Sequence, residues 1–176
     1  MSFTDFWPFI DTLLKVSLGS AITFSTIWLH SKRHPHAQAL SKRTRKLECL
    51  ESISAAVGNA NHAFAKYSAL VIESTRFGNN WPSARRMELE RVNTELVNEF
   101  KKLADAEANL LMLGEKTMEK TLRMYGAKIA LFRKQVYMGR QDISDQEIAD
   151  MKSNIMTLRE HFYDLLSRKY DRLLAA

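Results

Sequence analysis

Asp11 and Lys15 are the two residues whose types and spacing are best suited to chemistry. They stand four positions apart in an otherwise apolar run over residues 6–29, so on a helix their side chains share a face and can pair. Three small or polar residues continue that face: Gly19, Thr23 and Thr26. Ionisable side chains in a membrane segment are costly and are candidates for function, so we interpret these five residues as an intramembrane polar face. The alternative is that Lys15 extends to the lipid headgroups while Asp11 lies beside them.

A ridge of small side chains is the second feature of the same run. Ser17, Ala21 and Ser25 stand at four-residue intervals, which places them on one side of a helix. Small residues at this spacing let membrane helices approach closely, so we expect the ridge to be a helix-packing surface. Contact between copies through either face predicts self-association, and its narrower form is a pore lined by the polar face.

The element that must hold these residues is a transmembrane helix within residues 1–30. Trp7 and Trp28 are 21 positions apart, or about 31 Å along a helix. That length matches a hydrocarbon layer of about 30 Å with one tryptophan at each interface. We therefore predict a single-pass anchor, and the alternative is an amphipathic helix lying in the interface.

A basic segment, residues 31–47, follows the apolar run. Its six cations equal the net charge of +6 for the whole chain: Lys32, Arg33, Lys42, Arg43, Arg45 and Lys46. Cations at one end of a span attract anionic lipid headgroups and stay in the cytoplasm. We expect a cell (inner) membrane protein with its N-terminus outside and its body in the cytoplasm. Because the cations adjoin the membrane, we do not expect nucleic acid as a partner.

The cytoplasmic body, residues 37–176, is expected to be all-α. Glycine and proline number only 6 and 3, and apolar residues recur at intervals of three and four. Pro35 is expected to end the anchor helix. Three long antiparallel segments then form an elongated helical bundle or coiled coil, with bounds near 37–77, 83–138 and 144–174.

Local signals refine this body. Gly114 leaves the middle segment either bent or split, and the apolar pattern favours the bend. Ser83 is expected to cap that segment, and Ser144 with Glu147 predicts a capping box at the start of the last one. Trp81 is expected to pack back on the bundle from the turn at residues 78–82. The apolar spacing also assigns Leu40, Met87 and Leu111 to the inner faces of these helices.

The methionines allow two interpretations. Six of the eight lie in the second half of the body: Met112, Met118, Met124, Met138, Met151 and Met156. Methionine fills irregular gaps in cores, and it also forms adaptable binding surfaces. We favour the core, with a groove for a partner helix as the alternative.

No catalytic or metal-binding pattern accompanies these elements. Cys49 is the only cysteine, which excludes an internal disulfide and a thiolate zinc site. The histidines near the anchor, His30, His34 and His36, have no carboxylate or thiolate beside them. The sequence contains no glycine-rich phosphate loop and no nucleophile elbow. We therefore expect no enzyme, no metal, no cofactor and no small-molecule substrate.

These features favour a membrane-anchored cytoplasmic interaction or scaffold protein. It would self-associate or recruit a partner protein at the membrane face. The alternative function is an oligomeric membrane effector whose N-terminal helices form a polar-lined pore.

Overall fold

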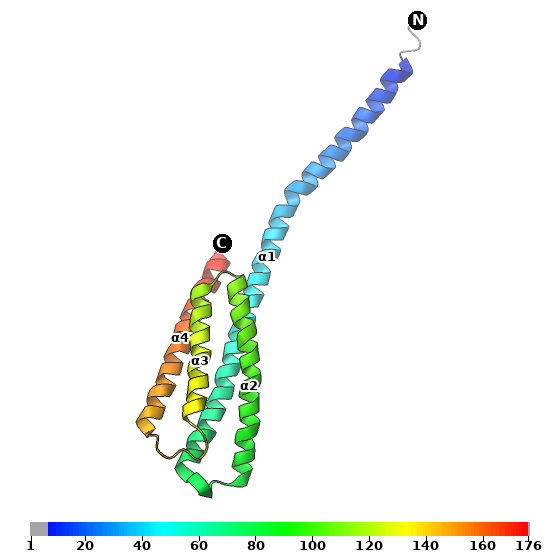
Figure 1. Ribbon diagram of the computed structural model, residues 1–176. Coiled ribbons are helices and arrows are strands. Elements are labelled where there is room, and N and C mark those ends of the chain that lie inside the picture. Colours follow the sequence, from blue (N-terminus) through cyan, green and yellow to red (C-terminus); the bar gives the residue numbers. More distant parts are fainter. Residues whose placement is uncertain (1–6, 176) are drawn as a thin grey trace. The chain divides into compact units, whose positions relative to one another are not determined.

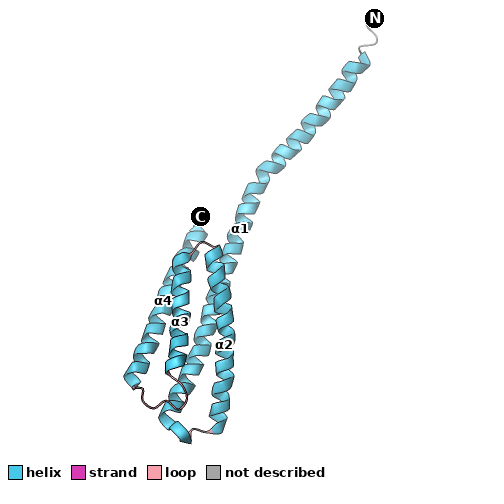
Figure 2. Ribbon diagram, in the orientation of Figure 1, coloured by secondary structure: helices cyan, strands magenta, loops and turns pink. Residues whose placement is uncertain are grey.

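The computed structural model describes the backbone of residues 7–175 and the side chains of 40–78 and 80–175. Within these residues every regular element is helical, and there is no strand (Figure 2). The helices are α1 (Trp7–Phe77), α2 (Ser83–Met112), α3 (Lys116–Gln135) and α4 (Asp145–Ala175), with a short 3-10 helix η2 (Gly78–Asn80). The all-α prediction is confirmed, but the body is built from four helices rather than three.

The chain divides into two compact units, Met1–Arg45 and Lys46–Ala176. In the first unit, the described backbone is helical from Trp7 onward. Pro35 lies inside α1, so the prediction that it ends the anchor helix is wrong. Proline removes one N–H donor and crowds the preceding turn. Here the helix-forming residues on both sides of Pro35 continue the helix through it.

The second unit is a four-helix bundle. Its part of α1 runs in one direction and α2, α3 and α4 then alternate, so that sequential helices are antiparallel (Figure 1). α3 packs between α2 and α4. α1 completes the bundle, because the hydroxyl of Tyr163 in α4 donates to the Ser54 carbonyl at 3.3 Å, and the hydroxyl of Tyr67 donates to the Val136 carbonyl at 3.4 Å.

The core forms where the apolar stripes of the four helices meet. Its largest fully buried side chains include Tyr125, Phe132 and Phe162. Phe64 of α1 meets Phe132 of α3 edge to face, with ring centroids 5.1 Å apart, a geometry that aromatic pairs favour. Burying such side chains contributes roughly 1.5–3 kcal/mol each, so this cluster is the main source of the bundle's stability.

Three residues predicted to face inward are exposed instead. Leu40, Met87 and Leu111 have exposed fractions of 63%, 65% and 53%. Leu40 belongs to the first unit, outside the bundle. In α2, Leu89 takes the inward position near Met87, and Leu110 takes the one beside Leu111. Residues one or two positions apart on a helix do not share a face.

Gly114 separates α2 from α3, so the prediction of a continuous bent helix is wrong. Its φ is +77°, in the left-handed region that glycine enters without a steric cost. The Glu115 N–H donates to the Leu110 carbonyl at 2.9 Å, and the Gly114 N–H donates to Leu111 at 3.0 Å. This pair of bonds is the Schellman motif that ends a helix, and the chain reverses direction there (Figure 1).

The two predicted helix caps have different outcomes. Ser83 does not cap α2, because Pro82 occupies the N-cap position with an extended backbone. The capping box of α4 is confirmed. The Glu147 N–H donates to Ser144 Oγ at 3.1 Å, and the Ser144 N–H donates to Glu147 Oε2 at 3.0 Å.

Among the residues searched, which are those the structure describes, no helix combines the length and apolarity needed to cross a membrane. The side chains of the predicted span within 1–30 lie outside the described ones. The transmembrane helix therefore receives no support from the fold and stays a prediction.

Candidate interaction surface

The predicted site residues of the N-terminal segment fall where no side chain is described. They are the interface anchors Trp7 and Trp28, the polar face Asp11, Lys15, Gly19, Thr23 and Thr26, the ridge Ser17, Ala21 and Ser25, and the first cations Lys32 and Arg33. Their backbone belongs to α1. A helical backbone is what their spacing requires, but their contacts stay predictions.

The remaining cations of the basic segment lie on described turns of α1. Lys42, Arg45 and Lys46 are exposed, and Arg43 is half-buried. Within this stretch the Thr44 hydroxyl donates to the Leu40 carbonyl at 3.0 Å. Exposed cations on successive turns can reach an acidic surface without first breaking structure.

A groove of about 280 Å³ lies between α1 and α2 of the described bundle. Small or polar side chains form most of its wall: Ser52, Ala55, Ala56, Asn59, Lys102, Asp105, Ala106 and Asn109. No histidine or cysteine lines it, so Ser52 has no imidazole beside it to form a Ser–His pair. Lys102 is already bound to Glu99 at 2.7 Å.

A buried polar group in the bundle core, the Tyr125 hydroxyl, was not anticipated from the sequence. The Tyr125 side chain is 0% exposed, and its hydroxyl has no hydrogen-bond partner among the described residues. Burial raises the pKa of Tyr125, with Arg159 opposing the shift weakly. The phenol therefore stays protonated at neutral pH and is not an acid–base group for catalysis.

The corner between α1 and α2 is the most connected polar cluster. The indole N–H of the buried Trp81 donates to Glu73 Oε1 at 3.1 Å, and Arg85 binds the same carboxylate at 2.9 Å. The Trp81 hydrogen bond, assisted by Arg85, lowers the pKa of Glu73. Arg85 also pairs with Glu88 at 2.7 Å. Each partner is satisfied within the corner, so the cluster stabilises a turn, and the predicted packing of Trp81 is confirmed.

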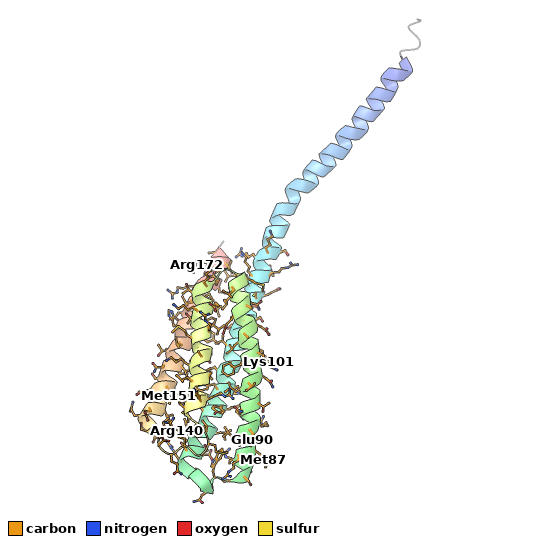
Figure 3. All side chains as sticks on the ribbon, in the orientation of Figure 1. Met87, Glu90, Lys101, Arg140, Met151 and Arg172 are labelled. Atoms are coloured by element: carbon orange, nitrogen blue, oxygen red, sulfur yellow. The ribbon has the colours of Figure 1, made fainter. Side chains whose placement is uncertain are left out.

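The exposure of most of the six methionines contradicts the prediction that they lie in the core. Only Met118 of the six is buried, and Met151 is partly buried. The other four are exposed by 36–79%: Met112, Met124, Met138 and Met156. Figure 3 places Met87 along α2 with Glu90 and Lys101, and it too is exposed. Flexible apolar side chains spread over a charged surface are typical of adaptable protein contacts.

Comparisons with protein-family models, curated proteins and solved structures found no match to this chain. Its function is therefore argued from its own residues. The described surface presents cations on α1 and exposed methionines on the bundle. Exposed cations and exposed methionines both suit contacts with other molecules.

Proposed function

We propose that this protein is a membrane-tethered interaction protein. Residues 1–30 hold it in a membrane, residues 31–47 contact anionic lipid headgroups, and the bundle presents its surface to partners. The first partner is another copy of the same chain. This proposal joins the N-terminal sequence pattern to the exposed surface of the helices.

The single observation that carries the proposal is the position of the exposed cations. Lys42, Arg45 and Lys46 are open to solvent on α1, and they follow an apolar run that ends at Leu29. A cation near an anionic membrane contributes about 1 kcal/mol of attraction. Lipid headgroups are therefore the ligands that best fit this segment.

Flotation of the full-length chain with lipid vesicles tests the tether. We expect the chain to float with neutral and with anionic vesicles and to resist an alkaline wash, because a spanning helix stays in the bilayer. An interfacial helix would float but be released by the wash. A chain that stays unbound with both kinds of vesicle would contradict the proposal.

Replacement of the exposed cations tests the headgroup contact. The unaltered chain should float at a lower lipid concentration with anionic than with neutral vesicles, and the triple variant Lys42→Gln, Arg45→Gln and Lys46→Gln should lose up to about 100-fold of that preference, since three charges are lost. The matched control neutralises three exposed cations of α2: Arg91→Gln, Lys101→Gln and Lys102→Gln. An equal effect in the control would show a general charge effect and remove the assignment to residues 31–47.

The pore alternative rests on Asp11 and Lys15. Replacing them with Asn and Gln should leave flotation unchanged under the tether proposal. Under the pore alternative the same pair of replacements should abolish vesicle conductance, because the two charges would be removed from the lining. Conductance of the unaltered chain, measured first, decides whether that comparison is needed.

A further inference from the structure

The outer face of α3 is uniformly basic. Its exposed charged residues are five cations: Lys116, Lys120, Arg123, Lys128 and Lys134. The one acidic residue of this helix, Glu119, is 8% exposed and lies beside Arg123. The remaining cation, Arg133, turns to α2 and donates to Asn93 at 2.6 Å. Glu119 pairs with Arg123, so no carboxylate of α3 balances the other four outer cations.

The outer face of α4 has the opposite charge over most of its length. From the start of the helix to Asp164 its exposed charged residues are five acids: Asp145, Glu147, Asp150, Glu160 and Asp164. The two cations of that stretch, Lys152 and Arg159, are half-buried. α3 and α4 lie side by side in the bundle (Figure 1), so one surface carries a basic strip next to an acidic strip.

Each strip has the spacing of a coiled-coil seam. On α3, intervals of four and three residues connect exposed Lys120, Met124, Ala127, Leu131 and Lys134. On α4, the same kind of spacing connects exposed Asp150, Ser153, Thr157, Glu160 and Asp164. A 3–4 spacing keeps side chains in line with a neighbouring helix. The seam of α3 brings apolar Met124 and Leu131 between its cations, whereas the seam of α4 is polar.

The ion pair between Lys169 and Glu115 fixes the level of α4 against α3. Lys134 stands 19 residues after Glu115, and Asp150 stands 19 residues before Lys169. Because antiparallel helices rise equally per residue, Lys134 and Asp150 lie at about the same height in the bundle. By the same reasoning Lys120 and Asp164, each five residues from the pair, are level.

We propose that the strips on α3 and α4 bind a second copy of this chain. A two-fold axis parallel to the helices places α3 of one copy on α4 of the other, antiparallel, and makes the same contact twice. Such an axis moves no residue along the helices, so Lys134 faces Asp150 of the other copy and Lys120 faces Asp164. This deepens the proposed function and rests on it, because it names the first partner.

The two-fold symmetry is compatible with tethering of both copies to one membrane. Both copies keep their Lys46 ends, where α1 enters the bundle, at the same end of the dimer. The contact is strongest toward the α3 C-terminus, because the last turns of α4 expose Arg168 and Arg172 near Lys116. Because the α4 seam is polar, Met124 and Leu131 meet no apolar partner there. Attraction between the strips is therefore mainly electrostatic, so the dimer should weaken as salt rises above about 0.15 M.

Charge reversal on each strip tests this contact in the full-length chain. In the first variant, Lys120→Glu and Lys134→Glu place acids opposite Asp164 and Asp150 of the other copy. In the second, Asp150→Lys and Asp164→Lys place cations opposite Lys134 and Lys120. Each variant alone should dimerise at least about 100-fold more weakly than the unaltered chain, because like charges then face each other. An equal mixture should recover a dimer that contains one copy of each, detected by two different affinity tags.

The control variant reverses two exposed cations of α2, Arg91→Glu and Lys101→Glu, and should dimerise normally. If the reversed variants still dimerise alone, or if their mixture forms no mixed dimer, the strips are not the contact. Association through the N-terminal segment, or binding of an acidic helix of another protein to α3, would then replace it. Flotation of the same variants should be unchanged. A failed tether with an intact mixed dimer would therefore overturn the proposed function alone.

Discussion

Two corners of the bundle reverse the chain direction in different ways. At residues 78–82 the chain reverses around Trp81, which is 2% exposed and bound to Glu73. At residues 113–115 the chain reverses around Gly114, and a Cβ on this residue would meet nothing within 4 Å. The first corner is held by a buried side chain, and the second is held by a backbone conformation. The bundle should therefore lose stability when atoms are removed from Trp81, and also when a Cβ is added at Gly114.

The largest expected effect is at the first corner. Trp81→Ala should lower the free energy of unfolding by about 3–5 kcal/mol, because it removes a buried aromatic side chain and leaves a cavity. Urea denaturation followed by circular dichroism measures the change. Trp81→Phe is the matched control: it keeps an aromatic ring but loses the N–H to Glu73 and should cost less. A loss below about 1 kcal/mol for Trp81→Ala would mean that the corner does not depend on this side chain.

A smaller effect is expected at the second corner. Gly114→Ala should destabilise the bundle by about 1–2 kcal/mol, since the added Cβ disfavours a positive φ. Gly58→Ala is the control with the opposite sign. Gly58 is helical, and its Cβ would lie 3.7 Å from the Tyr163 hydroxyl, an ordinary contact. That change should stabilise by about 0.5–1 kcal/mol. Equal signs for the two variants would contradict the backbone explanation.

The third corner, between α3 and α4, extends the comparison to a side-chain cap. Ser144→Ala removes the hydroxyl that accepts from the Glu147 N–H and should cost about 1 kcal/mol. Thermal unfolding followed at 222 nm checks this. Ser153→Ala, on the exposed face of the same helix, should be neutral or slightly stabilising, because alanine is the better helix former. A similar loss for both serines would rule out capping as the cause.

The smallest effect concerns the pH dependence of the first corner. The pKa of Glu73 is lowered from its ordinary value of 4.5, mainly by the Trp81 N–H. A carboxyl with a depressed folded pKa stabilises the fold above its unfolded pKa, and that stabilisation is lost as pH falls through the folded value. Glu73→Gln should therefore flatten the loss of stability below about pH 4.5. Denaturant midpoints between pH 6 and 3 test it, and an unchanged slope would contradict it.

The inner face of the bundle could be read from the sequence. Leu50, Ile53 and Val57 repeat at intervals of three and four and are at most 1% exposed, because apolar side chains on one helix face must all be buried together. The capping box at Ser144 was also visible, since its two residues satisfy each other without help from the rest of the fold. Local patterns of this kind do not depend on what lies elsewhere in the bundle.

The sequence was ambiguous wherever one residue fits two structures. Glycine at position 114 is tolerated in a helix and also ends one, and only the hydrogen bonds to Leu110 and Leu111 decide between them. Methionine fits a core and a surface equally, so the exposure of Met112 and Met124 could not be read from their type. For the candidate surface, the cations of α1 were predicted, whereas the two strips of opposite charge were not.

The sequence by itself determined that the described chain is helical, where its apolar stripes run, and that the net positive charge follows the N-terminal apolar run. Periodicity and charge are properties of neighbours along the chain, so they need no fold to be seen. Only the tertiary structure decided that the middle segment folds back at Gly114. It also decided that α3 packs against α4 with Lys169 paired to Glu115, which sets the basic strip level with the acidic one, because contacts between distant segments depend on how the helices pack.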